Sequence, residues 1–352
     1  MKFKKAYFRD RINSKLINLI FKFCKFKNDG KIIVKSMDGI GDILIRSKLV
    51  ELILDKYGKE NVVFLMKAPY KQLGEMLGYQ VYGVPRKDEK KIFRRLKMMY
   101  EINKEYSPRK FINIEFGNDS TVANISAPEK IGVYDSSDMV NCYNKYYTKS
   151  FKLEEEKILD KVRKIGEKVL DTKLDLKDII PDLRRKFNYK SEEKGIVVAV
   201  GSTDRSRVCS PLRLKDYILE VIKFFPDEKV ILVGNGELQK KYADELIKNL
   251  NGIEILDLVG KTDLRKVFEI VNNSKIFIGF ESGLYNLCFA TRTKAIALFK
   301  NINVPFAHDV PWIKVIGLEK ELIDDFNDLV YTNKEINNIS VERFRKAIEE
   351  LR

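Results

Sequence analysis

The feature that most constrains the fold of this chain is two series of short, apolar, β-branched runs that alternate with segments of helical period. The first series comprises residues 31–36, 61–67 and 111–116, and the second comprises 195–201, 229–235, 253–260, 276–280 and 294–299. Runs that are apolar on both faces and separated by helices are typical of parallel sheets covered on both sides. We therefore expect an α/β chain built from two doubly wound halves.

Two halves also fit the chain length, because 352 residues exceed one ordinary hydrophobic core. The charged stretch 183–194 precedes the second series, so we place the N-terminal domain at 31–188 and the C-terminal domain at 189–352. A helix predicted at 154–169 leads into this boundary. The segment that starts at Ser340, a residue suited to an N-cap, predicts a last helix that is a candidate to cross back to the N-terminal domain.

Residues 1–30 lie outside this alternation and predict a basic amphipathic helix. One side of that helix is apolar and comprises Phe8, Ile12, Leu16, Leu19, Ile20 and Phe23, and the opposite stripe carries Arg11, Lys15, Asn18, Lys22 and Lys25. Such a helix can lie in the interface of an anionic bilayer. It can equally pack its apolar side on the adjacent domain, and the sequence leaves both alternatives open.

The cysteine, histidine and charge content limits the kinds of site and the classes of partner that this chain can have. No apolar run approaches the roughly 18 residues of a membrane span. Cys24, Cys142, Cys209 and Cys288 form no C-x-x-C pair, which points to a reducing, cytoplasmic location. With His308 as the only histidine and no Asp-x-Asp motif, we expect no catalytic triad, no metal and no cofactor. The net charge of +15 favours anionic partners, but no motif supports nucleic acid.

The first strand of the N-terminal domain ends in a loop that contains Gly39 and Gly41, and a helix is predicted to start near Asp42. Ligands of parallel α/β sheets bind beyond the carboxyl ends of the strands, which is where this loop lies. Asp42 can therefore act as a general base on a substrate, or it can simply cap the helix.

The strand at 195–201 is followed by Ser202, Thr203, Arg205 and Arg207, which can form a phosphate cradle or an ordinary basic loop. Two further strand ends follow the same pattern. Glu237 comes after the strand at 229–235 and can contact ribose hydroxyls or complement the helix dipole, and Thr262 comes after the strand at 253–260.

The last such junction is formed by Glu281, Ser282 and Gly283, between the strand at 276–280 and an apolar helix. Backbone N–H groups at the start of this helix can bind a diphosphate. The junction is therefore the best candidate for the floor of a diphosphate site.

Taken in order, these junctions resemble glycosyltransferase family 9, the bacterial heptosyltransferase family. "IGD" at 40–42 is similar to the family's first strand–loop–helix motif, and "GKTDL" at 260–264 to its G-K-T-x-L segment. Residues 280–299 resemble its signature D-[ST]-G-x-x-H-L-A-A-A-x-G-x-P-x-x-A-L-F. "FINIEF" and "KIGVYD" also fall where the family places such segments, so the resemblance covers roughly residues 30 to 350.

The resemblance implies a GT-B architecture, in which two Rossmann-like, doubly wound domains face a cleft. It also implies inverting, metal-independent transfer of a sugar from a nucleotide-activated donor, typically ADP-heptose, to a lipopolysaccharide core. By position it implies Asp42 as catalytic base; Ser202, Thr203 and Arg207 as the phosphate loop; Glu237 at the ribose; Thr262 near the nucleobase; and Glu281, Ser282 and Gly283 at the diphosphate.

The sequence departs from the family pattern at three places. Glu281 stands in place of the signature's aspartate, Asn286 in place of its histidine, and "VCSP" in place of K-x-W-P, with Arg207 as the nearest substitute for the lysine. These departures leave open an alternative, a catalytically inactive nucleotide-sugar-binding protein of the same fold.

The acceptor side carries a basic stretch within residues 86–106. It contains Lys90, Lys91, Arg94, Arg95 and Lys97, which form either a surface for a phosphorylated glycolipid or a plain solvated helix face. We expect a glycosyltransferase that acts on a glycolipid or another cell-envelope glycan, peripheral to the inner face of the cytoplasmic membrane.

Overall fold

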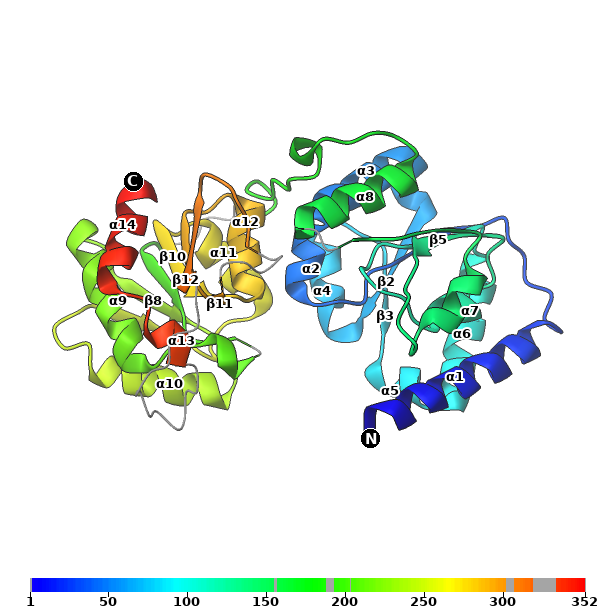
Figure 1. Ribbon diagram of the computed structural model, residues 1–352, viewed down its shortest axis with the longest axis horizontal. Coiled ribbons are helices and arrows are strands. Elements are labelled where there is room, and N and C mark those ends of the chain that lie inside the picture. The colour runs from blue at the N-terminus through cyan, green and yellow to red at the C-terminus, as the bar shows by residue number, and fades with distance from the viewer. Residues whose placement is uncertain are drawn as a thin grey trace. The chain divides into compact units, whose positions relative to one another are not determined.

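The computed structural model describes residues 2–154, 157–187, 193–202, 204–301, 307–318 and 334–351, and the chain divides into two compact units, Met1–Ile180 and Pro181–Arg352 (Figure 1). The second unit starts before the predicted boundary at 188/189. Leu183 explains this, because its N–H donates to the carbonyl oxygen of Ala290 at 2.7 Å and ties the segment before the second series to that unit.

The first unit is built on a parallel six-stranded sheet in the order β3-β2-β1-β4-β5-β6. Its strands are β1 (Ile32–Lys35), β2 (Val62–Lys67), β3 (Val81–Val84), β4 (Lys110–Asn113), β5 (Glu129–Val133) and β6 (Lys149–Phe151). The residues of β1 are all buried, as both-face coverage requires.

Helices α3 and α8 cover one face of this sheet, and α6 and α7 cover the other (Figure 1). The helices of the unit are α1 (Lys2–Phe21), α2 (Ile40–Ile45), α3 (Ser47–Tyr57), α4 (Lys71–Met76), α5 (Arg86–Lys90), α6 (Ile92–Tyr106), α7 (Thr121–Asn124) and α8 (Ile158–Leu170). The stretch predicted as one basic helix is thus two helices separated at Lys91, whose backbone is extended.

The second unit repeats the design with a parallel six-stranded sheet in the order β12-β11-β10-β7-β8-β9. Its strands are β7 (Ile196–Ala199), β8 (Val230–Val233), β9 (Ile255–Asp257), β10 (Ile276–Phe280), β11 (Ala295–Asn301) and β12 (Ile313–Leu318). Its helices are α9 (Pro211–Phe224), α10 (Glu237–Lys248), α11 (Leu264–Asn272), α12 (Gly283–Thr291), α13 (Lys334–Asn337) and α14 (Val341–Leu351).

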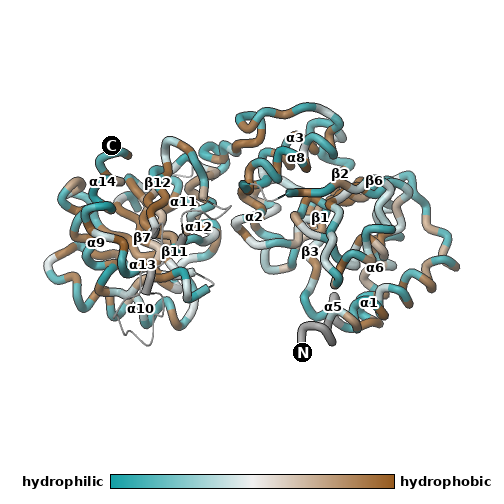
Figure 2. Tube along the Cα trace, viewed as in Figure 1, coloured by the Kyte–Doolittle hydropathy of each residue, from teal (hydrophilic) through white to brown (hydrophobic). Residues whose placement is uncertain are grey.

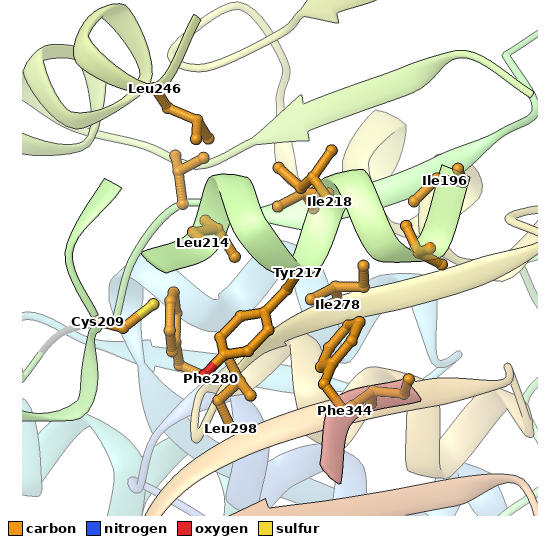
Figure 3. Close-up of a cluster of buried hydrophobic side chains, with 14 of the residues drawn as sticks. Ile196, Cys209, Leu214, Tyr217, Ile218, Leu246, Ile278, Phe280, Leu298 and Phe344 are labelled. Atoms are coloured by element: carbon orange, nitrogen blue, oxygen red, sulfur yellow. The ribbon is translucent and has the colours of Figure 1, made fainter. Parts of the chain in front are cut away.

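The core of the second unit fills the space between its strands and helices α9, α10 and α14 (Figure 3). Tyr217 of α9 stacks on Phe344 of α14, with ring centroids 4.6 Å apart, and both side chains are buried. Ser340 caps α14 as predicted, since its Oγ accepts the N–H of Arg343 at 3.1 Å. This packing places α14 in the second unit, which corrects the idea that the last helix returns to the N-terminal domain.

In both sheets the first strand in sequence lies beside the fourth, and the order reduces to 3-2-1-4-5-6. The predicted fold class is confirmed. The chain is α/β, and each unit forms one of the two Rossmann-like, doubly wound domains that the GT-B type contains. Figure 2 shows mostly apolar central strands and helices of mixed hydropathy. The order in which strands are added to the sheet reverses between β1 and β4 and between β7 and β10, and such a topological switch point is where open α/β sheets bind ligands.

Helix α1 packs beside α6 and α7 of the first unit (Figure 1). Its buried residues are Ser14, Ile17 and Phe21, whereas Phe8 and Leu16 of the predicted apolar side are exposed. The alternative in which that side packs on the domain is therefore wrong. None of the described helices is both long enough and apolar enough to cross a bilayer.

Candidate functional site

The switch point of the second unit brings together the loops that follow β7 and β10. The Ser202 hydroxyl donates to the backbone oxygen of Glu281 at 2.9 Å, so the two loops are joined directly. Thr203, the next residue of the predicted phosphate loop, lies outside the described residues. The sequence-based grouping of Ser202 with Glu281 follows from β7 and β10 being neighbours in one parallel sheet.

Arg207 reaches across the same switch point. Its Nη1 lies 3.1 Å from Oε1 of Glu281 and its Nε lies 3.6 Å from Oδ2 of Asp204. The Glu281 side chain is 17% exposed, and this burial raises the pKa of its carboxyl, against the opposing effect of Arg207. Glu281, which departs from the family pattern, thus forms an ion pair with Arg207, the nearest substitute for the family's lysine, and Arg207 holds a carboxylate where it can also hold an anion.

Helix α12 points its N-terminus into this group of residues. Ser282 is the N-cap, and its Oγ accepts the N–H of Tyr285, while Gly283 is the first helical residue. The body of the helix is buried, with Leu287 and Phe289 fully inside, so its start is fixed by the core. A rigid helix N-terminus next to an arginine is suited to a phosphate group.

Asn286, one turn into α12, has both ends of its amide occupied. Its Nδ2 donates to the Ser282 backbone oxygen at 3.2 Å, and its Oδ1 lies 2.8 Å from Nε2 of His308. Since Oδ1 can only accept, Nε2 of His308 carries the proton. Burial lowers the pKa of His308 to about 3, so the ring that holds Asn286 is neutral.

Sequence reasoning set His308 aside because it is the only histidine of the chain. Its ring stacks on Phe289 at 3.8 Å between centroids and on Tyr285 at 5.2 Å. The tertiary structure therefore restores an imidazole beside the position where the family signature has its histidine. The separation of 22 positions between Asn286 and His308 hides this contact from any local pattern.

Glu237 and Thr262 follow β8 and β9, on the other side of β7. The Glu237 side chain is exposed and pairs with Lys241 of the next turn at 3.1 Å. Thr262 is half-buried and stands just before Asp263, whose side chain caps α11. Among the described residues, no hydrogen bond joins either residue to Ser202 or Glu281, so their predicted ribose and nucleobase contacts stay predictions.

Gln239 of α10 was missed and lies against the ends of both β7 and β8. A Cβ added to Gly201 would stand 2.6 Å from its Cγ, and one added to Gly236 would stand 2.8 Å from its Oε1. Gly236 also has φ of +114°, a conformation that favours glycine. The glycines of these strand ends therefore make room for Gln239 at the floor of the loops.

In the first unit, Asp42 is the third residue of α2, at the switch point between β1 and β4. Its Oδ2 accepts the N–H of Gly39 at 3.2 Å, so the capping role is real, while Gly41 sits within the first turn. Burial raises the pKa of Asp42, partly offset by the nearby Arg46 and reinforced by Asp38. A carboxylate with a raised pKa is better matched to proton abstraction near neutral pH.

Arg46, which sequence reasoning also missed, fixes the geometry around Asp42. It is fully buried, its Nη2 lies 2.7 Å from Oδ2 of Asp38, and its Nη1 donates to the Ile114 oxygen at 2.9 Å. Its Nε also donates to the Asp42 backbone oxygen at 3.2 Å. One side chain therefore ties the loop after β1 to the end of β4; the only sequence signal for it is the spacing of one helical turn from Asp42.

A buried charge cluster lies at the same edge of the sheet. Lys35 at the end of β1 binds Glu115 and lies 3.0 Å from Oδ2 of Asp119, and Glu115 also accepts the N–H of Met37. Burial alone would lower the pKa of Lys35, but the two carboxylates outweigh it and raise the pKa. The lysine thus stays charged and holds the loop after β4 in place.

A pocket of about 330 Å³ opens at this edge, and its walls include Asp38, Lys67, Arg95, Glu115, Asp119 and Asp10. Arg95 is buried and binds Asp10 of α1, which corrects the prediction that it belongs to an exposed basic surface. Arg94 and Lys97 do remain exposed on α6. The pocket wall combines charged groups of both signs with apolar side chains, among them Leu65, Met98 and Met99. Such a mixed lining suits a sugar, whose hydroxyl groups and C–H faces need both kinds of partner.

Metal ligands are not gathered in the part of the chain that the structure describes: no group of three or more His, Cys, Asp or Glu side chains is arranged to hold an ion there. A sequence model of glycosyltransferase family 9 (heptosyltransferase) matches residues 122–315, more than half of the chain. That span includes the loops after β7 and β10 and ends in β12.

Individual relatives agree with this match. The chain is 22% identical over 289 residues to lipopolysaccharide heptosyltransferase 1 of Campylobacter coli, covering 76% of this chain and 83% of that protein. A glycosyltransferase family 9 structure from Veillonella parvula superposes with a TM-score of 0.72 at 16% identity, covering 92% and 97% of the two chains. The E. coli heptosyltransferase WaaC, solved with ADP-2-deoxy-2-fluoro heptose, gives 0.70 at 13% identity, covering 91% and 99%.

Proposed function

Because the chain belongs to glycosyltransferase family 9, the heptosyltransferase family, we propose that it transfers a sugar from a nucleotide diphosphate donor to a lipopolysaccharide core or another cell-envelope glycan. ADP-heptose is the first donor to test, since a solved relative was crystallised with an analogue of it. The observation that carries the proposal is the switch point of the second unit, where Ser202, Arg207 and the N-terminus of α12 converge.

The donor diphosphate binds at this switch point in the proposed complex. Gly283 and the residue after it offer backbone N–H groups, and Arg207 turns from Glu281 to a phosphate oxygen. Glu237 and Thr262 would contact the ribose and the nucleobase. Charge that develops on the departing diphosphate is then stabilised by these fixed donors, so no metal is required.

The acceptor glycan binds in the pocket of the first unit. Asp42 takes the proton of the acceptor hydroxyl as its oxygen forms a bond to the anomeric carbon of the sugar. The bond from that carbon to the diphosphate oxygen breaks on the opposite face, so the configuration inverts and the nucleotide diphosphate leaves. The raised pKa of Asp42 supports this role, which typically contributes about 10²–10⁴-fold to a rate.

One observation favours a second function, that of a nucleotide-sugar-binding protein without activity. Arg207 is already neutralised by Glu281, a longer carboxylate than the family's aspartate. If that pair persists with the donor bound, the leaving group lacks its cation. Both functions predict that the donor binds, and only the first predicts that its sugar is transferred.

The test combines binding and transfer on the full chain. Thermal unfolding is measured with ADP, UDP, GDP and ADP-heptose, because a true donor binds only the folded state and raises its unfolding temperature. Stabilised donors are then incubated with envelope glycolipids and followed by mass spectrometry. Transfer by the parent and none by Asp42→Asn supports the proposal; binding without transfer of any sugar establishes the inactive alternative, and no stabilisation by any nucleotide overturns both.

A further inference from the structure

Helix α1 leaves its larger apolar side exposed and packs another side on its domain, unlike an ordinary amphipathic helix. The side that faces α6 and α7 carries Asp10, Ser14 and Ile17, and its carboxylate is bonded: Asp10 binds Arg95 and accepts from Tyr143 at 2.9 Å. The apolar side is left in solvent. Its side chains are Phe8, Ile12, Leu16, Leu19, Ile20 and Phe23, with exposed fractions from 43% for Ile12 to 84% for Phe23.

The basic stripe runs as a row beside this apolar row and not opposite to it as predicted, because the buried Ser14, Ile17 and Phe21 form the opposite side. Arg11 and Lys15 are exposed and lie one turn apart on the same face of α1. The exposed Lys22 follows directly after the helix ends at Phe21. Asp10 is the only acid among residues 1–27, and it is turned inward toward Arg95. The outer half of α1 therefore combines a large apolar surface with positive charge alone.

We propose that this outer half of α1 docks on the surface of an anionic lipid bilayer, with the apolar row in the headgroup boundary and the basic row against the lipid phosphates. Both components of such binding are present, apolar area and cationic charge. From Phe8 to Ile20 the row is about 18 Å long at the rise of an α-helix, which lets the helix lie flat on a membrane plane, with Phe23 in the turn that follows.

A second copy of the chain fits this surface less well. Burying the apolar row of one α1 against that of another would bring the two basic rows together, with no acid on the outer half to pair them. An anionic bilayer removes that repulsion because its charge is opposite. The charge pattern thus favours lipid over self-association.

The docking also places the pocket of the first unit, a consequence that rests on the proposed function. Asp10 lines that pocket from the inner side of α1, so the pocket lies one helix diameter, about 10 Å, from the lipid-facing side. A glycan anchored in the same bilayer reaches this depth with its first few sugars. The helix would then serve as a spacer between the lipid surface and the acceptor hydroxyl.

Vesicle co-sedimentation of the full chain tests the docking without donor or acceptor. Vesicles of phosphatidylcholine alone are compared with vesicles of phosphatidylcholine and phosphatidylglycerol. We expect at least about tenfold tighter binding to the anionic vesicles, and a loss of that gain in high salt. Since no sugar is transferred, a failure here leaves the proposed activity standing, and the reverse also holds.

Matched variants separate the surface from general effects. Leu16→Ser/Leu19→Ser removes two exposed apolar side chains from α1, and Leu212→Ser/Leu219→Ser removes two of similar exposure from α9. Only the first pair should lose binding, by about tenfold or more. Lys15→Glu/Lys22→Glu should abolish the preference for anionic vesicles, whereas Lys168→Glu/Lys248→Glu should retain it.

Three results would overturn the proposal: equal binding to both vesicle types, vesicle binding by the α1 variants at the parent level, or a lipid-free dimer that Leu16→Ser/Leu19→Ser dissociates in analytical ultracentrifugation. The last result would assign the surface to a second copy. Circular dichroism and thermal unfolding of each variant confirm that a loss of binding is not a loss of fold.

Discussion

Arg207 and Glu281 form an ion pair across the switch point of the second unit, with Nη1 and Oε1 3.1 Å apart. The sequence places both residues at a phosphate site. In the structure, the Glu281 carboxylate is bound to the Arg207 guanidinium. An incoming diphosphate must therefore compete with the Glu281 carboxylate for the guanidinium. This competition makes the pair a control point for donor affinity.

Replacing Glu281 by glutamine should raise the affinity for ADP by about tenfold, because the amide keeps the shape but no longer neutralises Arg207. Arg207→Ala should lower the affinity by a similar factor. Isothermal titration calorimetry measures both. The hypothesis of competition is wrong if Glu281→Gln binds ADP more weakly than the parent.

The same pair predicts a pH dependence. Burial raises the pKa of Glu281, so its carboxyl becomes neutral at a higher pH than an ordinary glutamate and releases Arg207 as the pH falls. The ratio of ADP affinities, Glu281→Gln over parent, should accordingly fall toward one on acidification from pH 7.5 to 5. Taking the ratio cancels the titration of ADP itself, and a ratio that grows on acidification would contradict the prediction.

Asp42→Asn should reduce transfer by about 10²–10⁴-fold while leaving donor binding intact. It should also stabilise the fold at neutral pH. The raised pKa means that the folded state prefers the protonated carboxyl, so stability falls as pH rises through the ordinary aspartate range to the folded pKa, and the amide escapes this loss.

Urea unfolding at pH 7 and below pH 4 measures this gain, which should be present at pH 7 and absent below pH 4. Asp38→Asn is the matched control, because it leaves the buried Arg46 without its carboxylate and should destabilise. A loss of stability in Asp42→Asn at pH 7 would mean that capping outweighs burial.

Lys35→Met should destabilise the first unit by about 3–5 kcal/mol, since it leaves Glu115 buried without its cation. Lys48→Met breaks the half-buried pair with Glu51 at the surface and should cost no more than about 1 kcal/mol. Chemical denaturation of the two variants gives the comparison. Equal effects would show that the Lys35 cluster is solvated in solution.

His308→Phe keeps a ring between Phe289 and Tyr285 but removes the hydrogen bond to Asn286. Donor affinity should fall about fivefold, the order of one hydrogen bond. The folded pKa of His308, about 3, lies below that of free histidine. The free energy of unfolding of the parent should therefore fall by about 1.4 kcal/mol for each unit by which the pH is lowered from roughly 6.5 to 3.

The phenylalanine variant should lack this slope, while the loss from titrating carboxylates remains in both proteins. Stability curves of parent and variant over pH 3–8 provide the readout. Parallel curves would indicate that His308 is protonated in the folded state.

The sequence predicts most interior strands of both sheets, because they are apolar and β-branched, although β5 is absent from the predicted series. It does not predict β3, β6 and β12 at the sheet edges. The residues of β6 are mostly exposed, and β3 is half-buried with a glycine within it, so neither carries the both-face pattern. Edge strands receive their hydrogen bonds from one neighbour, and their pairing depends on tertiary context.

Some contacts of the candidate sites could be predicted from the sequence, and others depend on tertiary packing. Ser202 and Glu281 are brought together by strand order alone, which the alternation of strands and helices already implies. His308 reaches Asn286 through packing of aromatic rings far apart in sequence. The outward apolar side of α1 could not be predicted either, because what decides it is the buried Arg95, whose partner is Asp10.

Both sheets share one strand order, and in both the polar groups gather in loops beyond strands whose own residues are buried. Folding energy and ligand recognition therefore reside in different parts of the chain. Substitutions such as aspartate to Glu281, or histidine to Asn286, alter a loop or a helix start without touching a strand. A lineage can in this way exchange one sugar or acceptor for another while its scaffold persists, and relatives with little sequence in common can remain superposable.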